Sequence, residues 1–305
     1  MTDSSQTQLA YVVETVPGTT PAAPAFKKVR TTAVPSLIPD NNYAVSDEIR
    51  ADRNVPAAVK MSQSAGLEIP FEFSYSSFDD FLESFMGSAW ASNVLKNGTT
   101  QKFFTFESKL VTNGGTKYHR QRGLTANTFS LSIPATDKVS GSFGFMGKDG
   151  TVAAAAIASS TYANAPTGDF YDATDAVISL GGTPIPVRSA SIQGTNNNRI
   201  RPVVGSQYTD GIGLGRFEVG GQLEAYFNDS TLVDQFMADT YTTLQMVLTE
   251  PASGAYTILF PRVKLVAAPV PPGGNNGDVM ANLTWQAVYD STEQCTMKIT
   301  RAPLP

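Results

Sequence analysis

Few side chains in this sequence could do catalytic chemistry. His119 is the only histidine, and it lies in a polar stretch between Tyr118 and Arg120. Catalysis needs a nucleophile, a base and an orienting group close together, and no recognisable nucleophile elbow accompanies this histidine. Cys295 is the only cysteine, at an apolar position of an alternating segment, where a free thiol behaves as a small buried hydrophobe. Both residues are predicted to be structural, with His119 exposed or at an interface, and the chain is predicted not to be an enzyme.

Positions that could bind a metal are also weak. Segment 273–278 reads Gly-Gly-Asn-Asn-Gly-Asp, which looks like one turn of a calcium-binding repeat, but such turns bind calcium only in stacked arrays. We interpret it as a flexible loop. Asp79 and Asp80 are explained as capping residues at a helix start, and Asp172 with Asp175 as part of a solvated turn. The sequence therefore predicts no metal site, no phosphate loop and no cofactor.

The charges with the best claim to a functional role lie on two alternating segments, 67–75 and 217–227. A period of two places apolar side chains on one face of a strand and polar side chains on the other. The polar positions that we propose to line a channel are Glu68, Glu72, Glu218, Gln222 and Glu224. Two interpretations stay open. The residues form the wet face of an amphipathic strand, or they face a lumen and repel DNA phosphates.

These two segments belong to a longer internal repeat. Each runs into a short helix that carries its apolar residues on one face, and 81–86 aligns with 232–237 in residue type. The alignment matches Glu72 with Glu224, and it places capping residues before each helix at 76–80 and 228–230. Aromatic and alternating strands follow in both halves. The pattern predicts a mainly β (α+β) fold with two tandem β-sandwich or barrel domains, each with one flanking short helix, produced by duplication.

Composition sets the expected boundaries of these parts. Residues 1–55 are rich in proline and are predicted to be an N-terminal arm and interface loop that lies on a neighbouring subunit. The first domain is predicted at 56–150 and the second at 169–305. Between them, 151–168 is rich in small residues with little charge and is expected to be a linker or extended loop.

Charge and hydropathy exclude several classes of protein. Charged residues make up 16% of the chain, below the roughly 25% of typical soluble proteins, so we expect other protein surfaces to cover part of this one. The net charge of −5 and the lack of a basic stripe disfavour tight binding of nucleic acid. We see no signal peptide at the start, and no apolar run long enough to cross a bilayer, so no membrane partner is expected. A single cysteine fits folding in a reducing cytoplasm.

Two stretches suggest a family. The opening residues 8–21, and Ser-Asp-Glu-Ile-Arg-Ala-Asp-Arg at 46–53, precede a strand and a helix that end at Trp90. Together they resemble the N-terminal half of the tail tube proteins of siphoviruses, the long-tailed bacteriophages. The resemblance implies a β-sandwich or barrel with a flanking helix, an arm and loops that grip adjacent subunits, and rings stacked into a tube. Because proteins with one such domain form hexameric rings, two domains per chain predict three chains per ring with pseudo-sixfold symmetry.

The resemblance also implies binding partners and a localisation. The partners are further copies of this chain, the tape-measure, tail-terminator and distal tail proteins, and double-stranded DNA that passes through the tube. The protein is expected in the virion tail, and in the host cytoplasm during assembly. In segment 46–53 basic and acidic residues alternate, which suits ion pairs between subunits. Its proposed inter-subunit residues are Glu48, Arg50, Asp52 and Arg53.

Two other functions are compatible with the sequence. A β-sandwich adhesin would hold carbohydrate on clustered exposed aromatic residues, whereas the aromatic residues here fall mostly on inward faces. A capsid decoration or tail terminator protein would form one ring and stop. Microscopy of the purified protein distinguishes these functions, because only a tube protein forms long tubes.

Overall fold

Strands make up most of the computed structural model, which describes residues 7–228, 230–272, 275 and 277–303. The described residues contain two short helices, α1 and α2. The strands of the first half are β1 (Gln8–Glu14), β2 (Ala25–Lys28), β3 (Asp40–Val45), β4 (Ala58–Glu72), β5 (Val94–Lys96), β6 (Phe103–Thr112), β7 (Gly115–Pro134), β8 (Ser140–Gly147), β9 (Asp149–Ala153) and β10 (Thr161–Ala163), with α1 at Asp79–Met86. Those of the second half are β11 (Ala176–Leu180), β12 (Thr183–Pro184), β13 (Val187–Thr195), β14 (Arg199–Ile200), β15 (Ile212–Gly213), β16 (Glu218–Tyr226), β17 (Tyr241–Glu250), β18 (Gly254–Ala267), β19 (Met280–Ala287) and β20 (Lys298–Pro303), with α2 at Thr231–Met237.

The strands of the two halves pair in the same order. In the first half the antiparallel order is β1–β6–β7–β8–β4–β3. In the second it is β11–β17–β18–β19–β16–β13. The helix follows β4 in one half and β16 in the other. The prediction of a mainly β fold with one short helix per half is confirmed.

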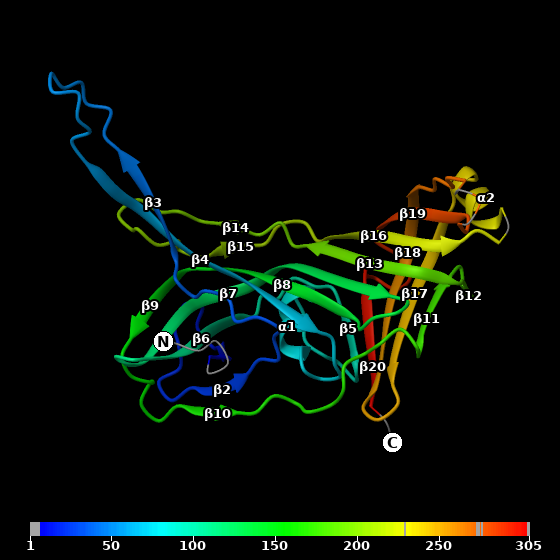
Figure 1. The fold of residues 1–305 in the computed structure, drawn as a ribbon, viewed down its shortest axis with the longest axis horizontal. Coiled ribbons are helices and arrows are strands. Elements are labelled where there is room, and N and C mark those ends of the chain that lie inside the picture. Colours follow the sequence, from blue (N-terminus) through cyan, green and yellow to red (C-terminus); the bar gives the residue numbers. More distant parts are fainter. Residues whose placement is uncertain (1–6, 229, 273–274, 276, 304–305) are drawn as a thin grey trace.

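One sheet crosses from half to half. Strand β13 pairs with β16 on one side and with the second part of β7 on the other, so Ile192 lies opposite both Gly221 and Leu131. The order β4–β8–β7–β13–β16–β19 is therefore continuous, and we call it the shared sheet (Figure 1). On its inner side a single apolar core extends through both halves.

Outer strands cover the core from the other side. The first part of β7 pairs with β6 and β9, while β18 pairs with β17 and, through its first residues, with β20. The chain end also ties the halves together, because β20 of the second half pairs with β5 of the first at Ile299 and Leu95.

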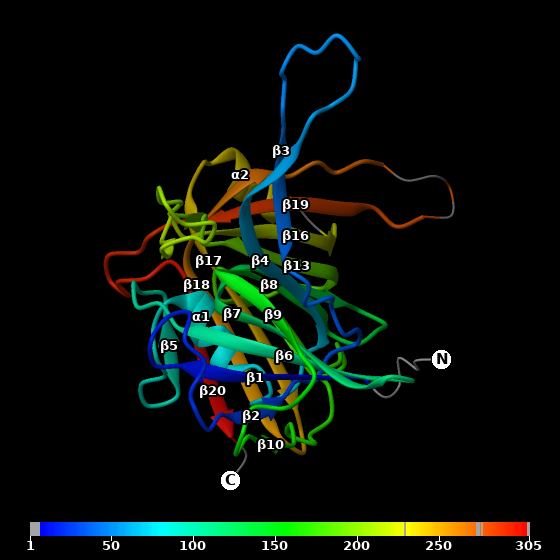
Figure 2. The same cartoon turned by 90° about the vertical axis from the view of Figure 1, so that its left-hand side faces the viewer.

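Two hairpin arms leave the sheet. The first arm, 40–64, is built on β3 and β4 and projects away from the molecule (Figures 1 and 2). The second arm, 196–217, carries β14 and β15 and lies along the first half, where the amide of Gln63 donates a 2.8 Å hydrogen bond to the carbonyl of Gln207. The first arm lies far from α2, which sits at the opposite end of the molecule (Figure 1).

The N-terminal segment and the expected linker are more structured than composition indicated. Strand β1 pairs with β6 along its whole length and β2 pairs with β1, so 8–28 belong to the first half rather than to an arm. Segment 151–168 contains the end of β9 and all of β10, which pair with β7 and β2. Small, weakly charged residues suit a covering strand as well as a loop, and composition alone does not separate the two.

The predicted helix caps are wrong for α1 and for Ser230 of α2. Neither Phe78, at the N-cap of α1, nor Ser230, at that of α2, makes a side-chain hydrogen bond to the helix start. Ser230 instead donates to the carboxylate of Asp234 at 2.7 Å, and Asp229 lies outside the described residues. Asp79 and Asp80 lie in the first turn of α1, where their charge still suits the helix dipole, but they are engaged by basic side chains of other elements.

Candidate functional site: the polar face of the shared sheet

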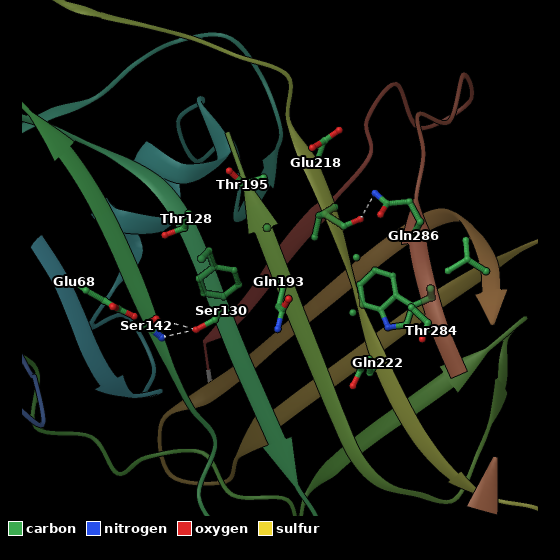
Figure 3. A pocket seen from close by; sticks show the side chains of 17 residues that line it. Glu68, Thr128, Ser130, Ser142, Gln193, Thr195, Glu218, Gln222, Thr284 and Gln286 are labelled. Atoms are coloured by element: carbon green, nitrogen blue, oxygen red, sulfur yellow. Dashed lines mark hydrogen bonds between the residues drawn. The ribbon is translucent and has the colours of Figure 1, made fainter. Parts of the chain in front are cut away.

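The outer face of the shared sheet is a broad polar surface. Figure 3 shows side chains from neighbouring strands projecting from it. They line a hollow of about 760 Å³. Hydroxyl and amide groups predominate, and two serines, Ser130 and Ser142, are joined across β7 and β8 by a 2.9 Å hydrogen bond. The polar residues that Figure 3 labels are Glu68, Thr128, Ser130, Ser142, Gln193, Thr195, Glu218, Gln222, Thr284 and Gln286.

Strand alternation accounts for this face. Ile69 and Phe71 are buried on the core side of β4, so Glu68 and Glu72 project from the other side. In β16 the buried residues Val219, Leu223 and Ala225 alternate with the outward positions in the same way. The five residues predicted to line a channel all lie on this one face: Glu68, Glu72, Glu218, Gln222 and Glu224.

Most of its carboxylates are paired with cations. Lys138 lies 2.5 Å from Glu72, and this carboxylate raises the pKa of the lysine. Arg188 contacts Glu224 at 3.5 Å. Among the described ion pairs none involves Glu68, which leaves it as the carboxylate without a basic partner.

The remaining carboxylate, Glu218, lies at the start of β16. Arg216 forms an ion pair with it, and the amide of Asn197 donates a hydrogen bond to it at 3.0 Å. The hydrogen bond from Arg216, helped by that from Asn197, lowers the pKa of Glu218. The face is thus mildly acidic, since three of its four carboxylates have a basic partner.

The first arm is the second candidate surface. The residues predicted to lie between subunits sit at its tip, and Glu48, Arg50, Asp52 and Arg53 are all exposed. Arg50 donates to Asp52 at 3.0 and 2.9 Å, which lowers the pKa of this carboxyl to about 2. The arm also exposes large apolar side chains, a feature that marks interaction surfaces. These are Tyr43, Val45, Ile49, Val55, Val59 and Met61.

The two aspartates of α1 have a structural role that the sequence did not reveal. Asp80 accepts hydrogen bonds from Tyr11 at 2.7 Å, Lys27 at 2.7 Å and Lys102 at 2.6 Å. Although burial acts to raise it, these hydrogen bonds, led by that of Lys102, lower the pKa of Asp80 to about 2. The helix is thereby fixed to β1, β2 and the start of β6.

Asp79 joins α1 to the second half. It accepts from Arg301 of β20 and from the hydroxyl of Tyr256 of β18. Burial raises the pKa of Tyr256, which stays a neutral donor. No local motif identifies such contacts, because the partners lie more than a hundred and seventy positions apart.

The residues that suggested chemistry are not assembled into a catalytic site. His119, predicted to be exposed or at an interface, is half-buried within β7, opposite Ser108 of β6 and Val152 of β9. Cys295 is fully buried just before β20, as predicted, and burial raises the pKa of its thiol. Asp172 and Asp175 are exposed as predicted.

The part of the chain that the structure describes contains no cluster of potential metal ligands. Gly273, Gly274 and Asn276 of the suspected calcium turn lie outside the described residues. None of the described helices has the length and apolarity needed to span a membrane.

Comparison with known proteins identifies the family. Residues 4–287 match the family described as phage tail tube protein. The match extends over nearly the whole chain and confirms the resemblance seen in the N-terminal residues. No curated protein sequence matches the chain.

Proposed function

Since the chain belongs to the phage tail tube protein family, a structural and non-enzymatic family, we propose that it assembles into stacked rings that form the hollow tail tube. The tube conducts double-stranded DNA to the host cell. The protein is made in the host cytoplasm and becomes part of the virion tail. Its partners are further copies of itself, and the tape-measure, tail-terminator and distal tail proteins.

The observation that carries this proposal is the shared sheet with its repeated strand order. We infer that the order arose by duplication, with the first unit at 56–150 joined to N-terminal strands, a connecting segment at 151–168, and the second unit at 169–305. Three chains then supply six units to a ring with pseudo-sixfold symmetry. Continuing the shared sheet from chain to chain would also remove its open edges, which endanger a free β protein.

We assign the polar face of the shared sheet to the lumen, with Glu68, Glu72, Glu218, Gln222 and Glu224 facing the DNA. A lumen must not hold the duplex, and unpaired cations would hold it through the phosphates. The basic side chains Lys138, Arg188 and Arg216 are each paired with a glutamate of this face, which supports the assignment. The first arm, with Glu48, Arg50, Asp52 and Arg53 at its tip, is assigned to contacts between subunits.

Negative-stain and cryo-electron microscopy of the purified chain test the assembly. We expect long hollow tubes in which each ring has threefold symmetry and sixfold pseudosymmetry. Single rings would support a tail terminator or decoration protein instead, and monomers at all concentrations would refute self-assembly.

A charge substitution tests the lumen separately. Replacing Glu68 and Gln222 by lysine places unpaired cations on the proposed lumen face of every chain, and assembled tubes should then retain DNA fragments at low salt and release them at high salt. The control replaces exposed Val177 of β11, outside the shared sheet, by lysine. Equal DNA retention by the two variants would refute the assignment of this face to the lumen.

A further inference from the structure

The joint between the two halves depends on a short segment at the end of β13. The side-chain amide of Asn196 donates to the carbonyls of Phe85 at 2.9 Å and Ala126 at 3.1 Å. Its backbone amide donates to the carbonyl of Asn127, the bulged residue of β7, at 2.8 Å. Asn196 is only 7% exposed, so this segment seals the contact of α1 and β7 with the second half.

The second half contains a bulged strand, β18, and a helix, α2, that match β7 and α1, but no segment of the described residues covers them. Strand β18 has a bulge against β19 between Leu265 and Ala267, as β7 has against β8 between Ala126 and Thr128. Val266 therefore corresponds to Asn127, and it is 54% exposed.

Helix α2 corresponds to α1 and is uncovered in the same way. It has no buried residue, and Met237 is 74% exposed. In α1, by contrast, the aligned residues Phe85 and Met86 are buried. The helix and strand surface that receives Asn196 in the first half is thus open in the second.

The first half contains a matching copy of the inserted segment. Asp40 pairs with Ser64 of β4, and Thr195 pairs with Glu218 of β16. Ser64 and Glu218 occupy the same position relative to Ile69 and Leu223, which face Phe143 and Leu283 on the next strand.

Segment 40–42 (Asp-Asn-Asn) therefore corresponds to 195–197 (Thr-Asn-Asn), and Asn41 corresponds to Asn196. Asn41 is exposed, whereas Asn196 is buried. The segment lies at the base of the first arm, far from α2 in the same chain (Figure 1). It therefore cannot fill the open surface of its own chain.

We propose that Asp40–Asn42 of one chain fills the open surface on the second half of a second copy, as Thr195–Asn197 fills it within the chain. The amide of Asn41 donates to the carbonyls of Phe236 and Leu265 of the partner subunit. The inference rests on the proposed function, and it identifies the two surfaces by which neighbouring chains of a ring contact each other. Because the two surfaces differ and lie at opposite ends, the contact is heterologous, the type of contact that generates a ring when its rotation closes.

Disulfide trapping tests this contact. Thr195 lies opposite Thr128, so the matching pair across the joint of two chains is Asp40 and Ala267. Opposite residues of antiparallel strands have Cα atoms about 4.5–5.5 Å apart, within disulfide range. Chains with Asp40→Cys are assembled with chains carrying Ala267→Cys and then oxidised.

We expect a disulfide-linked dimer on a non-reducing gel from the mixture and none from either variant alone. The buried native Cys295 stays in place. Pairing Asp40→Cys with Val177→Cys, an exposed position on β11, is the control and should give no dimer. A chain with both Asp40→Cys and Ala267→Cys should give a ladder that ends at the number of chains in one ring.

Normal tubes or rings without the dimer would overturn this inference and leave the proposed function intact. Failure of the unmodified chain to assemble would overturn both. In a second test, Asn41→Leu should raise the concentration needed for assembly at least tenfold without changing the melting temperature of the isolated chain, whereas Asn196→Leu should lower that temperature. Assembly of the Asn41→Leu chain at the normal concentration would overturn the role assigned to its amide.

Discussion

The ring of Phe85 tests how the two halves hold together. It is 1% exposed and packs against Phe129 and Phe217, with both ring centroids 5.3 Å away. It also lies directly on β13, because a Cβ atom added to Gly194 would come within 2.5 Å of its Cζ atom. Phe85→Ala removes a ring that joins α1 and β7 to the second half.

The expected loss can be worked from this packing. Replacing a buried phenylalanine by alanine costs about 3–5 kcal/mol, and more where the surroundings cannot collapse into the cavity. Gly194 and Phe129 lie on paired strands of the shared sheet, so we expect about 4 kcal/mol. Urea unfolding of the unassembled chain, followed by circular dichroism, measures this loss as a lower transition midpoint at an unchanged slope.

A double-variant cycle isolates the contact. Gly194→Ala alone overpacks the joint and should cost about 1–3 kcal/mol. In the Phe85→Ala background the added methyl group enters the cavity, so the combined loss should fall short of the sum by about 1 kcal/mol.

The control is Phe236→Ala, at the aligned position in α2. Its ring is half-buried in a helix without buried residues, so the loss should be less than half of that for Phe85→Ala. Equal losses for the two phenylalanines, or additive effects of Phe85→Ala and Gly194→Ala, would refute this account of the joint.

Three further predictions concern single groups. Because the pKa of Asp80 is lowered from 3.8 to about 2 in the folded chain, its contribution to stability, about 2 kcal/mol, is present above pH 5 and is lost as the pH falls toward 2; in urea titrations Asp80→Asn should flatten this dependence, and an unchanged acid slope would contradict it. Burial, together with the hydrogen bond to Glu107, raises the pKa of Tyr162 to about 12, so its hydroxyl stays a neutral donor at neutral pH. Because Tyr162→Phe removes this hydrogen bond, it should cost about 1 kcal/mol and speed hydrogen exchange in β10 but not in β17. Cys295 should react with a thiol reagent only as fast as the chain unfolds, and rapid labelling of the native protein would show that its burial is wrong.

Hydrophobic periodicity predicted the strands and the helical face because both depend on local spacing. The alternation in 67–75 and 217–227 placed the buried and outward residues of β4 and β16 correctly, and the apolar residues of α1 are buried as expected. The arms, the joint and the partners of Asp79 and Asp80 depend on residues far apart in sequence, and spacing carries no information about them.

Hydrophobic alternation also does not determine which residue of β4 corresponds to which residue of β16. The sequence alignment matched Glu72 with Glu224, but the strand pairing matches Ile69 with Leu223, and hence Glu68 with Gln222 and Pro70 with Glu224. A pattern with period two fits equally well when shifted by two residues, since every side chain keeps its face. All five predicted lumen residues therefore lie on one face even though the alignment that paired them was shifted.

The low charge of the chain and the position of its exposed apolar residues have one explanation. Large apolar side chains are exposed on the first arm, as with Ile49 at 100% and Val55 at 67%, and on the second half at Met237 and Val266. A monomer gains nothing from displaying them, and patches of this kind mark interaction surfaces. If the end of β13 in each chain covers α1 and β7, two surfaces of the described part of the chain stay uncovered. One is the surface of α2 and β18 at one end of the molecule, and the other is segment 40–42 with the first arm at the opposite end. When segment 40–42 of one chain fills the open surface of a second copy, that contact buries one surface of each chain. The contact that joins the two halves within a chain then also joins one chain to the next.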